Sequence, residues 1–204
     1  MQNGGVFLKV RCSKKVAVDP EFGFSWWKRF RKTVTNPTNI GAQFFEVTSD
    51  EFFERNAPTV FANQQVDLAF IDGMHEFDYV LNDVNNTLRY LSENGVIVLH
   101  DCNPQTRDAA VPFQAYKERG YTGIWNGDVW KVIPYLKKYR PDLHVFVADC
   151  DQGLGVVTKR GETKELADVG REEFRKMTYD ELSSRRKDLL SLQPQDYLER
   201  FIEM

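Results

Sequence analysis

The stretch VDLAFIDGMHEFDYVLNDVNNTLRYLSENGVIVLHDCNP, residues 66–104, decides the fold of this chain. It opens with an apolar run over 66–71 and closes with a second apolar run over 96–99. Between the two runs, apolar residues recur at helical spacing, and Asn94-Gly95 is a typical helix end. This order predicts a βαβ unit. Because both runs are mostly apolar and carry apolar residues on both faces, we expect the parallel strands of this unit to be covered by helices on each side.

The flanking sequence extends this unit into a Rossmann-like, doubly wound α/β fold with a mostly parallel sheet. Upstream, we expect strands over 15–19 and 43–47, a partly helical aromatic segment over 24–32, and a helix that begins at the capping box of Thr48 and Glu51. Downstream, the pattern predicts helices over 109–119 and 129–139, the second interrupted at Pro134. Residues 144–148 and 155–158 predict an antiparallel hairpin.

The chain becomes polar and charged after Lys159. A second capping box, Thr178 and Glu181, predicts a helix to Leu190, and a last short helix is expected over 195–202. We therefore expect an α/β domain over residues 1–160 and a helical C-terminal extension over 161–204 that stands apart from the site.

Composition limits the possible functions. The 204 residues carry a formal net charge of −3 without a sustained block of Lys or Arg, so no nucleic-acid partner is expected. The apolar runs are too short to span a bilayer, so no membrane association is expected either. The three cysteines are widely spaced, which favours reduced thiols and a cytoplasmic location.

Three acids, Asp19, Asp72 and Asp101, each follow an apolar strand candidate. In an open parallel sheet, ligands bind at the carboxyl ends of the strands, so we expect these side chains to converge on one crevice. Each acid alone is equally explained by a turn or a helix cap, since Asp is common in both. Their shared register favours a binding site.

Asp72 and Asp101 are expected about 5 Å apart if their strands are neighbours. Two carboxylates that close repel each other unless a proton or a cation lies between them, and their oxygens suit Mg²⁺ or Mn²⁺. His75 or His100 could add a nitrogen ligand or act as a general base. For His100, packing at the strand end is an equally good explanation.

The quoted stretch resembles the core of class I S-adenosylmethionine-dependent methyltransferases. It is most similar to the small-molecule O-methyltransferase-like group, which has an I-D-G-x-H motif after one strand and an H-D or E-D pair after the next. Asn3-Gly4-Gly5, the strand that ends at Asp19, and the hairpin around 149–155 continue the likeness, so that it covers roughly residues 3–160.

The resemblance implies a role for each matching residue. Gly4 and Gly5 would end the glycine-rich loop under the cofactor S-adenosylmethionine, and Asp19 would bind its ribose hydroxyls. Asp72 and Asp101 would hold a divalent cation, with His100 beside them. His75, with Asp72, would be catalytic by deprotonating a substrate hydroxyl. The resemblance also implies that Asp128 and Trp130 face this site, although an Asp at a helix start is equally explained as an ordinary cap.

Two departures from the family pattern are visible. His100 stands where metal-dependent relatives often have Glu, and only Met1–Asn3 precede Gly4, where relatives have a strand and an acidic E-x-G motif. The strand that relatives have next to the one ending at Asp72 is therefore expected to be missing. Either the domain is N-terminally truncated, or the sheet closes without this strand and the cofactor loop is incomplete.

Three functions follow from these patterns. The leading hypothesis is methylation of a hydroxyl on a small molecule or sugar. The alternative is an inactive methyltransferase-fold module for binding or for assembly into a homo-oligomer, with the aromatic residues Phe24, Trp26, Trp27 and Phe30 as a contact patch. A third hypothesis is a metal-dependent hydrolase that uses Asp72, Asp101 and His75.

Overall fold

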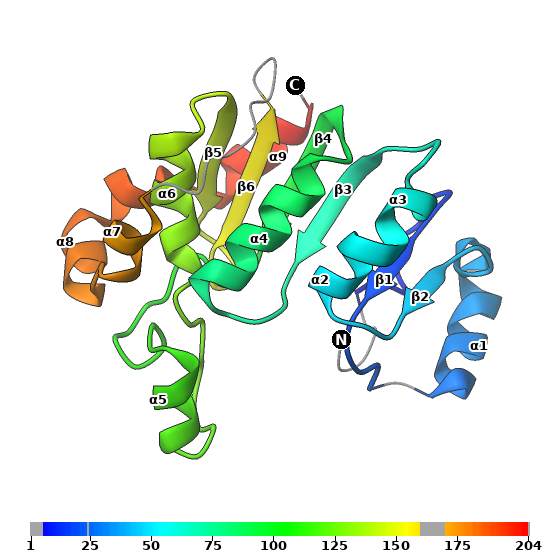
Figure 1. Ribbon diagram of the computed structural model, residues 1–204, viewed down its shortest axis with the longest axis horizontal. Coiled ribbons are helices and arrows are strands. Elements are labelled where there is room, and N and C mark those ends of the chain that lie inside the picture. The colour runs from blue at the N-terminus through cyan, green and yellow to red at the C-terminus, as the bar shows by residue number, and fades with distance from the viewer. Residues whose placement is uncertain (1–5, 24, 160–169, 204) are drawn as a thin grey trace. The chain divides into compact units, whose positions relative to one another are not determined.

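The computed structural model describes residues 6–23, 25–159 and 170–203. The chain divides into two compact units, residues 1–64 and 65–204 (Figure 1). Gly4 and Gly5, the expected glycines of the cofactor loop, lie outside the described residues.

The first unit is built on a short parallel pair, β1 (Val16–Val18) and β2 (Gln43–Phe45). Both strands were expected, and helix α1 (Trp26–Thr35) lies between them in the chain. The unit also contains η1 (Pro37–Asn39), α2 (Ser49–Glu51), the π-helical turn η2 (Phe52–Asn56) and α3 (Ala57–Val60). The helix start expected at Thr48 is confirmed, because its side chain accepts a hydrogen bond from the Glu51 amide.

The second unit opens with the βαβ unit that the sequence predicts. Strands β3 (Val66–Ile71) and β4 (Leu91–Leu99) pair in parallel, and helix α4 (Phe77–Leu88) connects them. The predicted antiparallel hairpin is also present as β5 (Leu143–Ala148) and β6 (Leu154–Lys159). The sheet has the order β3-β4-β6-β5-β7. It is therefore a mixed sheet of a Rossmann-like α/β fold.

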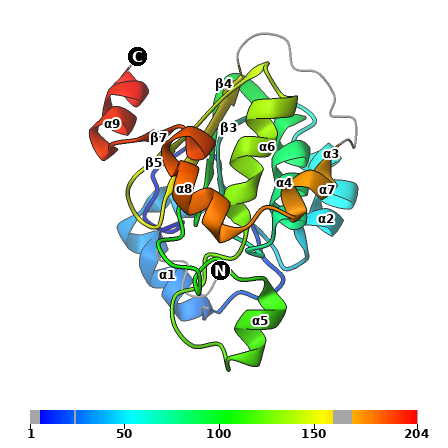
Figure 2. The same cartoon turned by 90° about the vertical axis from the view of Figure 1, so that its left-hand side faces the viewer.

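Helices cover both faces of this sheet. Helices α4 and α6 (Val132–Tyr139) pack on one face, and α9 (Gln195–Glu203) lies on the other, beside β5 (Figure 2). The helix expected over 129–139 begins as the 3₁₀ turn η3 (Val129–Lys131) and becomes α-helical at Val132. Pro134 does not interrupt it, because a first-turn proline lacks only an N–H that would have no partner inside the helix.

Helix α5 (Phe113–Glu118) is shorter than expected, because Pro112 occupies its N-cap position in an extended conformation. It belongs to an excursion over residues 102–128, which projects beyond the end of the sheet where β3 and β4 terminate (Figure 1).

The segment after residue 170 is mostly helical, as expected, but it is not an appendage. Helices α7 (Arg171–Arg175) and α8 (Tyr179–Leu190) contribute Phe174, Leu182 and Leu190 to the buried core around α4 and α6. The capping box of Thr178 and Glu181 is confirmed. A short strand that the sequence did not indicate, β7 (Leu192–Gln193), then pairs in parallel with β5.

Two details of the βαβ unit correct the sequence analysis. Asn94-Gly95 is not a helix end: α4 ends at Leu88, and Gly95 lies within β4. Glycine is required there for close approach, since a Cβ would lie 2.8 Å from the Val66 carbonyl oxygen. In addition, β3 is not covered on both faces. It is the edge strand of its sheet, and Leu68 and Phe70 are exposed.

Candidate active site

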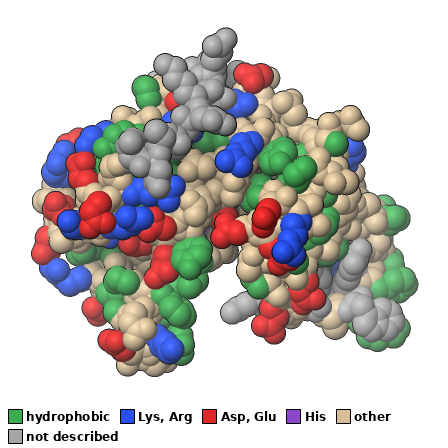
Figure 3. Space-filling model, viewed as in Figure 1, with side chains coloured by type: hydrophobic (Ala, Val, Ile, Leu, Met, Phe, Trp, Pro, Cys, Tyr) green, Lys and Arg blue, Asp and Glu red, His purple; other side chains and the backbone are tan. Residues whose placement is uncertain are grey.

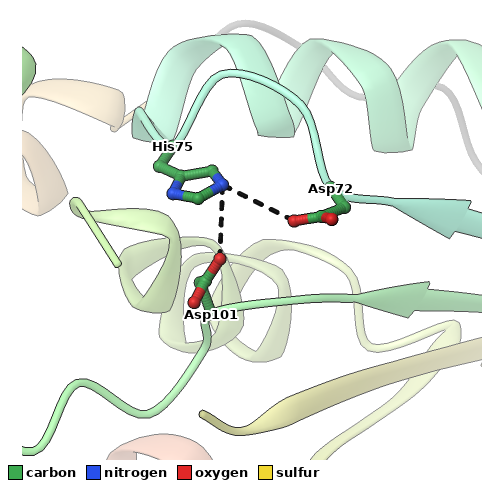
Figure 4. A group of neighbouring side chains, drawn as sticks. All are labelled: Asp72, His75 and Asp101. Carbon is green, nitrogen blue, oxygen red and sulfur yellow. Dashed lines mark ion pairs between the residues drawn. The ribbon is translucent and has the colours of Figure 1, made fainter. Parts of the chain in front are cut away.

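Asp72 and Asp101 lie together because they follow neighbouring parallel strands. Ile71 pairs with Leu99 at the ends of β3 and β4, so the residues that follow leave the sheet side by side. Asp72, His75 and Asp101 each offer a ligand atom, and these atoms lie within 4.8 Å of one another (Figure 4). The structure thus brings together two acids and a histidine that the sequence selected.

His75 reaches the acids from the loop between β3 and α4. Its Nε2 lies 3.5 Å from Oδ1 of Asp72 and 3.2 Å from Oδ2 of Asp101. Its Nδ1 lies 3.0 Å from the carbonyl oxygen of Trp125, and the imidazole stacks on the Trp125 indole with ring centroids 4.9 Å apart. Because a carbonyl oxygen only accepts hydrogen bonds, Nδ1 carries a proton and Nε2 is directed at the carboxylates.

His100 contacts the same two acids from the end of β4. Its Nδ1 lies 2.9 Å from Oδ2 of Asp101 and 3.4 Å from Oδ1 of Asp72. Its Nε2 lies 3.5 Å from Oδ2 of Asp151, an exposed acid of the β5–β6 turn. His100 is therefore part of the site.

The pKa values of these groups are coupled. Burial alone would raise the pKa of Asp72, but hydrogen bonds and positive charge from His100 and His75 lower it well below its usual range. Hydrogen bonds to Asp101 and Asp72 raise the pKa of His100 to about 10. At His75, burial lowers the pKa, but the hydrogen bond to Asp72 and the negative charges of Asp101 and Asp72 outweigh burial, so the pKa of His75 is raised. Without a cation, a protonated His100 thus balances the carboxylates, and a bound cation would replace its Nδ1 proton.

Asp101 has an unusual backbone conformation and a side-chain partner that the sequence analysis missed. Its φ is +63°, in the left-handed region, and the residue is 5% exposed. Its Oδ1 accepts a hydrogen bond of 2.6 Å from Nδ2 of the fully buried Asn126. Trp125 and Asn126 follow no strand, so the strand-end rule could not select them. The only local signal was Asn126-Gly127, a common turn dipeptide.

Asp128 and Trp130, which the sequence left as candidates for the site, have structural roles. Oδ1 of Asp128 accepts a 2.6 Å hydrogen bond from the amide of Phe77, the first residue of α4, so Asp128 caps that helix from a distant part of the chain. Its Oδ2 bonds to Lys131. Trp130 is buried in the hydrophobic core, at 1% exposure.

Asp19 belongs to the first unit and is half-buried at the end of β1. Its amide donates to the Phe45 carbonyl oxygen, and its Oδ1 accepts a 2.9 Å hydrogen bond from the Glu21 amide. Two hollows are lined by described residues, one beside β5 and one within the first unit. Neither is lined by Asp19, Asp72 or Asp101. The crevice shared by Asp19, Asp72 and Asp101 therefore stays a prediction.

Comparison with known proteins agrees with the resemblance seen in the sequence. Residues 3–102 match the family described as a methyltransferase domain, and this range includes the I-D-G-x-H and H-D motifs. Among curated proteins, no sequence matches the chain significantly. Within the described residues, no helix has the length and apolar character that crossing a membrane requires.

The chain is also similar to solved structures, at low sequence identity. A Corynebacterium glutamicum protein is 20% identical with a TM-score of 0.47, and the match covers 72% of this chain and 61% of that one. An SAH-bound methyltransferase of Podospora anserina is 16% identical with a TM-score of 0.44, covering 72% and 71%. An O-methyltransferase family protein of Burkholderia thailandensis is 11% identical with a TM-score of 0.45, covering 78% and 54%. The chain thus spans less than two thirds of the first and third of these proteins.

Proposed function

We propose that this chain is an S-adenosylmethionine-dependent methyltransferase that methylates a hydroxyl group of a small molecule or sugar. A divalent cation, Mg²⁺ or Mn²⁺, would assist the transfer. The observation that carries the proposal is the meeting of Asp72, His75 and Asp101 at the ends of two parallel strands, in a chain whose residues 3–102 match a methyltransferase domain.

Asp19 fits the part of the site that would bind the cofactor. A carboxylate at the carboxyl end of a parallel strand is the usual partner of ribose hydroxyls in nucleotide-binding α/β folds. Asp19 has this place at the end of β1 and is half-buried, so its carboxylate is accessible from one side. When bound, S-adenosylmethionine would supply an electrophilic methyl group and leave as the neutral thioether.

The donor set fits a divalent cation. Nδ1 of His100 lies 3.4 Å from Oδ1 of Asp72 and 2.9 Å from Oδ2 of Asp101, and these atoms form a mixed oxygen and nitrogen set, which suits Mn²⁺ and tolerates Mg²⁺. We assign Asp72, Asp101 and Nδ1 of His100 to the cation. A cation held there would lower the pKa of an acceptor hydroxyl and fix its position.

His75 then serves as the general base. Its Nδ1 proton is engaged by the Trp125 carbonyl oxygen, so that Nε2 is the atom that can accept a proton. Nε2 would take the proton of the acceptor hydroxyl, whose oxygen would receive the methyl group that the cofactor supplies when bound. Oδ1 of Asp72 lies 3.5 Å from Nε2 and would orient the imidazole toward the acceptor.

Calorimetry tests the cofactor part of this proposal. Saturable binding of S-adenosylmethionine is expected for the wild type and is expected to be lost in Asp19→Ala. The matched control is Asp50→Ala, which removes an exposed acid of the same unit and should bind as the wild type does. The absence of heat with both S-adenosylmethionine and S-adenosylhomocysteine would reject the proposal.

One observation favours a second candidate, a module for self-assembly. Trp27 and Phe30 on helix α1 are 58% and 56% exposed and pack edge to face, with ring centroids 6.3 Å apart. Exposed aromatic side chains of this kind are typical of protein interfaces. If a second copy of the chain covers them, light scattering will give a stable oligomer that dissociates in Trp27→Ala.

A further inference from the structure

Asn126 is buried in a way that packing alone does not explain. It is 0% exposed, and its Nδ2 donates to Asp101 Oδ1 at 2.6 Å and, over a longer 3.4 Å, to Gln152 Oε1. Its amide oxygen, however, has no hydrogen-bond partner among the described residues. Leaving a buried polar atom without a partner costs about 1–3 kcal/mol, and an apolar side chain of similar size would avoid that cost. The presence of asparagine is therefore accounted for by what its Nδ2 does to Asp101.

That hydrogen bond fixes the direction of the other carboxylate oxygen. The terminal torsion of an aspartate is soft, so an unrestrained carboxylate rotates over a broad range. With Oδ1 bound to Asn126, Oδ2 of Asp101 is directed at Nε2 of His75 and Nδ1 of His100. The oxygen that faces both histidines is thus selected by a residue outside the acid and histidine cluster.

Asn126 is itself anchored on both sides. The amides of Asn126 and Gly127 both donate to the carbonyl oxygen of Ala109, at 2.8 and 3.0 Å. The amide of Asp128 donates to the His75 carbonyl oxygen at 3.1 Å, and the Trp125 carbonyl oxygen accepts from His75 Nδ1. Residues 125–128 therefore bind the backbone and the ring of His75 while Asn126 binds Asp101.

We propose that Asn126 is a positioning residue, which aims Oδ2 of Asp101 at the cation and at Nε2 of His75. The inference rests on the proposed function, because it assigns Asn126 to the cation site described above. Asn126 does not contact the reacting atoms. It acts through Asp101, in the way that hydrogen-bonding partners of metal ligands usually tune affinity.

The test is Asn126→Leu, which removes the donor and keeps a side chain of similar size. The matched control is Asn85→Leu: Asn85 lies on α4 and also has a buried amide oxygen without a partner among the described residues. Calorimetric titration with Mn²⁺ should give a dissociation constant about 10–100 times higher for Asn126→Leu than for the wild type. The value for Asn85→Leu should equal the wild-type value. An unchanged Mn²⁺ affinity in a folded Asn126→Leu would overturn the proposal.

A second measurement keeps the two proposals separate. The ¹⁵N NMR signals of the His75 ring, recorded without metal, report the contact between Nε2 and Asp101. They should shift in Asn126→Leu and stay in place in Asn85→Leu. If the wild type binds no Mn²⁺, the cation site is rejected, and unchanged His75 signals would still overturn the role of Asn126. If Asn126→Leu does not fold, Asn126→Ala, which introduces no larger group, replaces it in both measurements.

Discussion

Nε2 of His75 lies 3.2 Å from Oδ2 of Asp101, although the two residues leave different strands of the sheet. His75 arrives from the loop after β3, and Asp101 stands directly after the short turn that ends β4. The parallel pairing of the two strands is what allows the contact, since it brings both strand ends to the same edge. Each prediction below tests a consequence of that arrangement or of the segment that supports it.

Replacement of Asp101 by asparagine should weaken Mn²⁺ binding by at least about tenfold, because an amide oxygen carries no charge to offset that of the cation. Isothermal titration of the purified protein gives the affinity directly. Asp196→Asn, in an exposed pair with Arg200 on α9, serves as the control and should bind as the wild type does. Equal affinities for Asp101→Asn and the wild type would exclude Asp101 as a ligand.

Substitutions of His75 and His100 should affect different steps, because His100 is assigned to the cation and His75 to proton transfer. His100→Ala should weaken Mn²⁺ binding, because the Nδ1 atom assigned to the cation is lost. His75→Ala should keep most of that affinity and lower kcat by about 10²–10⁴, the usual contribution of a general base. Metal titration and methyl-transfer rates measured on both variants check this. If His75→Ala loses the cation as well, His75 is a ligand rather than the base.

Gly127→Ala should destabilise the protein strongly. Gly127 has a φ of +62°, and a Cβ there would lie 1.7 Å from the His75 carbonyl oxygen. Gly123 has a similar φ of +79° with nothing within 4 Å, so Gly123→Ala carries only the backbone cost of about 1–2 kcal/mol. Urea unfolding should show Gly127→Ala to be less stable than Gly123→Ala by at least about 2 kcal/mol. Equal losses would mean that the close approach does not exist.

Asp78 should make stability depend on pH. A hydrogen bond from Arg175, helped by the charges of Arg175 and Arg171, lowers the pKa of Asp78 in the folded protein. A lowered folded-state pKa contributes stability above the unfolded value, and that contribution is lost as pH falls through the folded value. Asp78→Asn should therefore cost about 0.5–1 kcal/mol near neutral pH, a typical value for exposed ion pairs. The difference from the wild type should shrink below about pH 4. Urea unfolding at several pH values measures it, and a constant difference would contradict the ion pair.

Much of the fold could be predicted from short-range pattern. The apolar runs and the 3.6-residue period of 77–88 predicted β3, α4 and β4, and the hairpin of β5 and β6 followed from alternating runs around a glycine-bearing turn. Strand β7 could not be predicted, because two residues carry no periodicity. The exposure of Leu68 and Phe70 was also missed, since sequence pattern does not tell an edge strand from a central one.

The candidate site could likewise be predicted from the sequence only in part. Asp72, His75, His100 and Asp101 were found because they follow strand ends, a position that the sequence marks directly. Trp125 and Asn126 contact these residues only because the chain returns to the sheet after the α5 excursion, 50 and 25 positions from their partners. Contacts of that kind depend on tertiary packing, which no local motif records.

The excursion that carries α5 extends away from the sheet and holds exposed apolar side chains, including Tyr121 and Ile124, and hydrophobic patches are visible over it (Figure 3). Its returning end contributes the groups that orient His75 and Asp101. An opening of this excursion that left every strand paired would therefore abolish ligand binding without unfolding the domain. By linkage, a ligand bound at the acids would hold the excursion closed, so that the amide proton of residue 128, which binds the His75 carbonyl oxygen, would exchange more slowly with solvent when the site is filled.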